Sequence, residues 1–166
     1  MYRKIEDFQN EWAYETEMTT KLFNNLTDAS LAQKVTDEGR TLGFLAWHIV
    51  LTVGEMPSHV GLKVEAPAED APVPTAAREI AEAFAKAAKS LGEEVARNWT
   101  DETLLAEDEM YGQTWKRGMT LRALINHQTH HRGQVTVLMR QAGVPVVGVY
   151  GPTKEEWEKM GMAALA

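Results

Sequence analysis

The sequence contains no cysteine among its 166 residues. Disulfide bonds, thiolate metal sites and cysteine nucleophiles are therefore all excluded. Any transition-metal site in this chain must be built from histidine and carboxylate side chains, which are the remaining strong ligands for such ions. The five histidines are consequently the residues on which such a site would depend.

Long apolar runs and an excess of basic residues are also missing. The net charge is −7, and the lysines and arginines form no basic run, which argues against a nucleic-acid partner. No apolar run approaches the length of a membrane span, and the charged start, MYRKIEDFQNEW, is unlike a signal peptide. We expect a cytoplasmic protein with no nucleic-acid or membrane partner that acts on a small-molecule substrate.

Helical periodicity dominates what remains. A length of 166 residues, 44% of them hydrophobic, fits a single domain over residues 1–166 with a sizeable core. Apolar residues recur at the three-four spacing of amphipathic helices, which predicts four long helices at about 5–26, 41–57, 75–98 and 120–142. Thr41 and Thr120 are expected to cap the second and fourth of these. The predicted fold is all-α, with a short C-terminal helix opened by the capping-box pair Thr153 and Glu156.

Two polar residues interrupt the apolar face of the first predicted helix. Glu15 and Thr19 both fall at positions that should face the other helices. One interpretation is a wide helix face with Glu15 at its edge, since charged residues are rarely fully buried. The other is that both side chains line a cavity.

The stretch from Asn126 to Gln134 holds three of the five histidines. On a helix, His127 and His131 lie one turn and about 40° apart, so both rings can aim at one point. Two histidines at this spacing coordinate a metal ion in other proteins. His130 falls at about −60°, away from the apolar face, and is expected to bond at a surface. The alternative is that the inward histidines are only core residues bonded to carbonyl groups.

A third histidine is available on the second predicted helix. His48 lies on an otherwise apolar face, and Thr52 and Glu55 continue a narrow polar strip beside it. His48, His127 and His131 are therefore the candidate metal ligands. Glu55 is a weak catalytic candidate, as a proton acceptor or extra ligand, or instead a partner that orients a ligand histidine. Gln134 is a weaker candidate for such an orienting role.

Three segments resemble the DinB/YfiT-like family of metal-dependent enzymes. They are Leu45-Ala-Trp-His48-Ile, the His127-x-x-x-His131-Arg-Gly-Gln motif, and Tyr150-Gly-Pro-Thr-Lys-Glu-Glu-Trp157. Their order and spacing cover most of the chain. One departure is Gln128, where the family motif often has glutamate, so a carboxylate role at that position is not carried over.

The resemblance implies an antiparallel four-helix bundle, often a homodimer, with a divalent metal held by His48, His127 and His131. Imidazole ligands suit zinc, nickel or iron. Members of the family with known activity transfer low-molecular-weight thiols or isomerise thiol-dependent substrates, and others resemble hydrolases. The first hypothesis is thus a metal-dependent thiol S-transferase or related hydrolase with a thiol cosubstrate. The alternatives are a non-catalytic metal-binding stress-response protein that acts through dimer or partner contacts, and a helical protein with core histidines and no metal.

Overall fold

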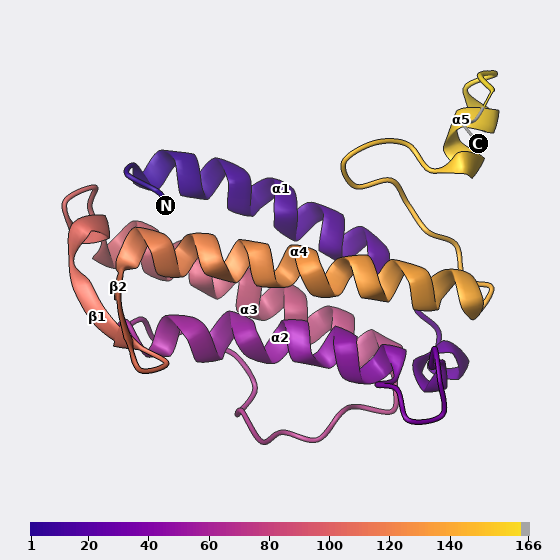
Figure 1. The fold of residues 1–166 in the computed structure, drawn as a ribbon, viewed down its shortest axis with the longest axis horizontal. Helices are drawn as coiled ribbons and strands as arrows, with labels where there is room; N and C mark the ends of the chain where they lie inside the picture. The colour runs from indigo at the N-terminus through magenta and orange to yellow at the C-terminus, as the bar shows by residue number, and fades with distance from the viewer. Residues whose placement is uncertain (164–166) are drawn as a thin grey trace.

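The computed structural model describes residues 1–163, which form a mostly helical fold with one small sheet (Figure 1). The four long helices are α1 (Ile5–Phe23), α2 (Leu42–Ser58), α3 (Ala77–Asn98) and α4 (Arg117–Gln141). The short elements are the 3-10 turns η1 (Asp28–Ala32) and η2 (Thr103–Leu105), the strands β1 (Glu107–Met110) and β2 (Gln113–Lys116), and the helix α5 (Lys154–Lys159). None of the helices within residues 1–163 combines the length and apolarity needed to cross a membrane.

The four long helices lie side by side and share one hydrophobic core. The helix α2 packs against α3 and α4, and α1 packs against the same two helices from the other side (Figure 1). Fully buried side chains from all four meet in the centre, among them Phe8, Ile49, Phe84 and Leu121. The four long helices predicted from periodicity are therefore present, with ends that differ from the prediction by a few residues.

The helices α2 and α3 run in the same direction, so the neighbouring helices are not all antiparallel (Figure 1). Just after α2 ends, the Lys63 backbone N–H donates to Glu94, which lies near the end of α3. Further along the same connection, the Trp47 indole donates to the Ala71 carbonyl near the beginning of α2. The connecting segment 59–76 therefore returns along the length of α2 before α3 begins.

A β-hairpin between α3 and α4 corrects the prediction of an all-α fold. The strands β1 and β2 pair antiparallel, with Glu107 opposite Lys116 and Met110 opposite Gln113. Tyr111 and Gly112 form the two-residue turn with φ of 52° and 77°, the left-handed combination that suits a tight hairpin. Strands of four residues are too short for a clear period-two pattern, so periodicity missed them.

The hairpin also moves the start of α4. Thr41 caps α2 as predicted, because its hydroxyl accepts from the Phe44 N–H at 3.0 Å. Thr120, by contrast, lies inside α4, which begins at Arg117 directly after β2. The helix passes so close to the N-terminal segment that a side chain at Gly118 would collide with the Tyr2 carbonyl oxygen.

A buried ion pair joins α1 to α4. Glu15 is 3% exposed and bonds to Arg132, which is 2% exposed. Thr19 accepts hydrogen bonds from Arg132 at 3.0 Å and from Gln128 at 2.8 Å. Glu15 is therefore not at the edge of a wide helix face, and neither it nor Thr19 lines an open cavity: both belong to a polar network inside the protein.

The C-terminal segment is anchored on this network through Tyr150. The Tyr150 hydroxyl contacts Glu15 at 2.6 Å and Arg132 at 2.7 Å. The capping box predicted for Thr153 and Glu156 is present at the start of α5. In Figure 1 α5 stands away from the four long helices, and it has no buried residue, so Tyr150 rather than Trp157 ties this segment down.

Removing one partner of the buried pair should destabilise the protein strongly. The substitution Glu15→Ala leaves the buried Arg132 guanidinium without its counter-charge. We therefore expect a loss of about 3–5 kcal/mol in the free energy of unfolding. Urea denaturation measures this loss. The matched control is Glu17→Ala on the same helix, whose partner Lys21 is half exposed and whose loss should stay near 0.5 kcal/mol. Equal losses in the two variants would show that the buried pair is not needed.

Candidate metal centre

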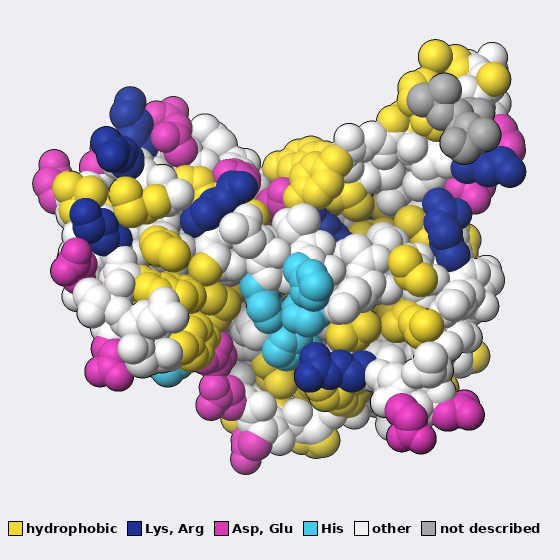
Figure 2. All heavy atoms as spheres, viewed as in Figure 1, with side chains coloured by type: hydrophobic (Ala, Val, Ile, Leu, Met, Phe, Trp, Pro, Cys, Tyr) yellow, Lys and Arg dark blue, Asp and Glu magenta, His cyan; other side chains and the backbone are white. Residues whose placement is uncertain are grey.

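Three histidine rings from α2 and α4 point at one another. The Nε2 atom of His127 lies 3.2 Å from Nε2 of His48 and 3.1 Å from Nε2 of His131. His48 and His127 are half-buried, and His131 is buried. Figure 2 shows histidine side chains gathered near the middle of one face of the molecule. The packing of α2 against α4 therefore brings together the three residues that the sequence singled out.

The spacing of these nitrogens suits a metal ion. A zinc-like ion bonds imidazole nitrogen at about 2.0–2.1 Å in tetrahedral geometry, which separates neighbouring ligand atoms by about 3.3 Å. The two measured separations are within about 0.2 Å of that value. His48, His127 and His131 could thus hold one metal ion, since their candidate ligand atoms all lie within 4.8 Å of one another.

Hydrogen bonding among the three rings alone leaves the arrangement incompletely satisfied. The Gln134 amide oxygen lies 2.7 Å from His131 Nδ1, so that nitrogen carries the proton and His131 Nε2 presents a lone pair. The single N–H of His127 Nε2 can then point at His131 or at His48, but not at both. A cation between the rings instead accepts all three lone pairs, which is the donor set a metal requires.

The protein keeps these imidazoles neutral. Burial, and to a lesser extent the neighbouring histidines, lower the pKa of His127 to about 4. Burial is also the main cause of the lowered pKa of His48 and of His131. At neutral pH the three lone pairs are therefore available to a metal without prior loss of a proton.

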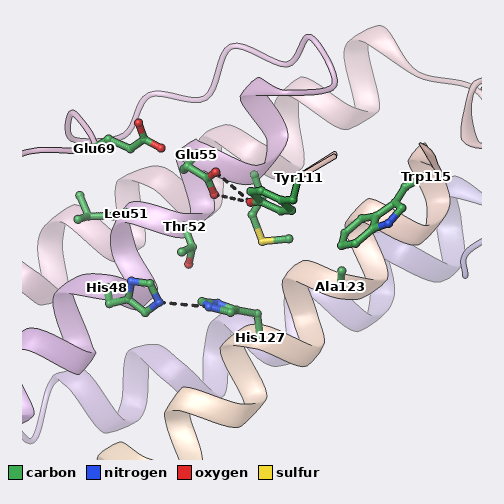
Figure 3. Close-up of a pocket in the computed structure, with 10 residues that line it drawn as sticks. His48, Leu51, Thr52, Glu55, Glu69, Tyr111, Trp115, Ala123 and His127 are labelled. Carbon is green, nitrogen blue, oxygen red and sulfur yellow. Dashed lines mark hydrogen bonds between the residues drawn. The ribbon is translucent and has the colours of Figure 1, made fainter. Parts of the chain in front are cut away.

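A cavity of about 500 Å³ opens beside the histidines. His48 and His127 form one end of it, and Leu51, Met56 and Ala123 give it apolar walls (Figure 3). Its volume falls in the range that small-molecule ligands occupy in proteins. A ligand in this cavity would have direct access to two of the three histidines.

Glu55 lies in this cavity, but it does not orient His48. Its carboxylate accepts hydrogen bonds from the Tyr111 hydroxyl at 2.8 and 2.9 Å, and it lies 2.9 Å from His59 Nε2 (Figure 3). Within residues 1–163 it is also outside the histidine group that could hold a metal. The structure therefore gives no support to Glu55 as an orienting partner or as a ligand, and its role as a proton acceptor stays a prediction.

Three polar residues of α4 close to the histidine pair have different surroundings. Gln134 contacts His131 as expected of an orienting partner. His130 is exposed, as its place on the helical wheel indicated. Gln128 is buried against Thr19 on α1, so it points away from the three histidines.

Sequence reasoning missed Glu69, and it favoured core packing over a pocket wall for Tyr111 and Trp115. Tyr111 and Trp115 reach it from the hairpin, and Glu69 reaches it from the 59–76 segment. His59 directly follows the last residue of α2 and contacts Glu55 at 2.9 Å. The four-residue spacing from Glu55 was the signal that could have placed His59 beside that carboxylate.

The opposite side of the histidine group is basic. The Arg40 guanidinium lies 4.9 Å from the centre of the Phe44 ring, which in turn stacks on His48. Arg40 and Gln134 line a second cavity of about 310 Å³ whose remaining walls are largely apolar. The histidine group therefore has an acidic, aromatic cavity on one side and a single arginine, Arg40, close to His48 through the Phe44 ring.

The chain matches the model of the DinB family over residues 1–162. It is 46% identical to the uncharacterized protein YrdA of Bacillus subtilis (strain 168) over 164 residues, which cover 99% of this chain and 98% of YrdA. The crystal structure of a DinB-like protein from Bacillus cereus ATCC 10987 is also 46% identical, has a TM-score of 0.88, and matches 90% of this chain and all of that one.

A second solved structure shares the fold alone. It is a DinB-like protein from Bacillus subtilis with 16% identity and a TM-score of 0.68, and the match covers 88% of this chain and 98% of that chain. The family model, the close relative and the close structural neighbour agree with the resemblance that the motifs indicated. The chain belongs to the DinB family.

Proposed function

We propose that this protein is a metal-dependent enzyme that joins a low-molecular-weight thiol to an electrophilic small molecule. His48, His127 and His131 hold the metal, with zinc or nickel favoured and iron also compatible with imidazole ligands. The observation that carries the proposal is the convergence of three Nε2 atoms at the end of a cavity of ligand size. A closed structural metal site would have four protein ligands and no such cavity.

The residues around the site have distinct tasks in this proposal. His48, His127 and His131 would hold a divalent metal through three imidazole nitrogens, and such an ion would lower the pKa of a thiol or water bound to it. Gln134 fixes the ring of His131 through Nδ1. The apolar walls at Leu51 and Met56 limit water around the reacting group. Glu55 lies across the cavity from the histidines, where Tyr111 holds its carboxylate in place.

Two alternatives would use the same metal site: one catalyses a different reaction and the other catalyses none. A related hydrolase would use water in place of the thiol at the same site. A non-catalytic metal-binding protein would bind the ion and convert no substrate. Metal content and turnover therefore have to be measured separately.

Metal content is the first test. The untagged protein should contain about one equivalent of a divalent transition metal per chain by elemental mass spectrometry, because the three lone pairs converge on one point. His48→Ala and His131→Ala should each lose it. His130→Ala is the matched control: this exposed neighbour is outside the group and should leave metal content unchanged. Wild-type protein that takes up neither zinc nor nickel would overturn the proposal.

Turnover is the second test, on metal-loaded protein with thiols paired against alkyl and epoxide electrophiles. Consumption of both substrates should require metal and vanish in His48→Ala. Glu55→Gln should keep the wild-type metal content, because within residues 1–163 Glu55 lies outside the histidine group. Ester hydrolysis without thiol would identify the hydrolase instead. Full metal loading with neither reaction would favour the non-catalytic alternative.

The lowered pKa of His127 predicts how pH affects the metal-free protein. The folded His127 has a pKa of about 4, whereas an unfolded histidine titrates near 6.5. Between these values the unfolded chain binds a proton that the folded chain does not, so stability should fall as pH drops from about 6.5 to 4. Urea midpoints measured in chelator across this range test the slope. His127→Asn should flatten it and His130→Ala should not; identical slopes in all three proteins would contradict the assignment.

A further inference from the structure

The end of the cavity opposite His48 and His127 carries two carboxylates. Glu55 comes from α2 and Glu69 from the 59–76 segment, and both line the same space (Figure 3). No lysine or arginine is among the residues that line this cavity within the described part of the chain. Whatever occupies this end therefore meets a negative potential that no lining basic residue offsets.

Glu55 is held rigidly in its place. Its side chain is 16% exposed, and its two carboxylate oxygens both accept from the Tyr111 hydroxyl. Tyr111 reaches this position from a turn with φ of 52°, a conformation that bulky residues rarely adopt.

Two aromatic rings also line this cavity, and Trp115 lies on the far side of Tyr111 from Glu55 (Figure 3). Tyr111 and Trp115 both line it, and their rings meet edge to face with centroids 5.9 Å apart. His59 lies against Tyr111 on the side of Glu55, with ring centroids 5.4 Å apart. Carboxylates attract organic cations through their charge, and aromatic rings attract them through the ring quadrupole; this cavity is lined by both.

We propose that this end of the cavity binds the ammonium group of a substrate whose other end reaches the three histidines. This inference rests on the proposed function for the reacting end and extends it by naming a charge that the substrate must carry. Glu55 and Glu69 supply the counter-charge, and Tyr111 and Trp115 supply the aromatic faces. Neutral and anionic substrates of the same shape are discriminated against.

The helix geometry sets the length of such a substrate. Glu55 lies seven residues beyond His48 on α2, which places their backbones about 10 Å apart along the axis. An extended six-carbon chain between a thiol and an amine has a comparable reach. The matched probes are therefore 6-amino-1-hexanethiol and its neutral counterpart 6-mercapto-1-hexanol.

The experiment is calorimetric titration of zinc-loaded protein with each thiol, and of the same protein with n-hexylamine, which lacks the thiol. We expect the amino thiol to bind about tenfold more tightly than the hydroxy thiol, from one charge-assisted contact with aromatic support. Glu55→Gln and Glu69→Gln should each reduce this ratio to about threefold or less. Glu109→Gln removes an exposed carboxylate of the same hairpin that does not line the cavity, and it should leave the ratio unchanged.

The outcomes separate this inference from the proposed function. Equal affinity for the two thiols, with thiol transfer intact, would overturn the ammonium subsite and leave the enzyme proposal standing. Binding of n-hexylamine that depends on Glu55 and Glu69, without any thiol binding, would support the subsite and refute the thiol reaction. Absence of binding by all three probes would overturn both.

Discussion

The buried ion pair between Glu15 and Arg132 decides how α4 is rotated. Charges that are almost fully buried have to be paired and hydrogen-bonded, because desolvation costs several kcal/mol for each ion. Arg132 satisfies this condition only when it points at α1. Successive helical residues are about 100° apart, so this constraint turns the preceding residue, His131, towards α2. The position of one metal-site histidine thus depends on an ion pair that lies outside the metal site.

The sequence predicted the long helices and the histidine group for the same physical reason. Helical periodicity relates residues three and four apart without knowledge of the tertiary structure, so His127 and His131 could be paired on one helix. The absence of cysteine and the apolar surround of His48 then singled out the third histidine. In the structure these rings meet, while their role as metal ligands is a proposal.

What sequence reasoning failed to find depends on contacts between segments distant in the chain. The burial of Glu15 follows from Arg132, which lies 117 residues later, and no local pattern reveals such a partner. Tyr111 reaches Glu55 because a short hairpin turns it towards α2. Its strands are too short to have a recognisable period. The prediction of an all-α fold was therefore wrong in the segment that builds one wall of the cavity.

The parallel course of α2 and α3 has a consequence for how this protein can diverge. It requires a connection that runs back along the whole of α2, and that connection carries Glu69 to the cavity. Surface connections tolerate substitution and changes of length far better than packed helices do. Relatives can therefore acquire different ligand preferences through this one segment, while the helices that place the histidines stay the same. Diversity in the family should concentrate at the rim of the cavity, and the three histidines at its base should vary least.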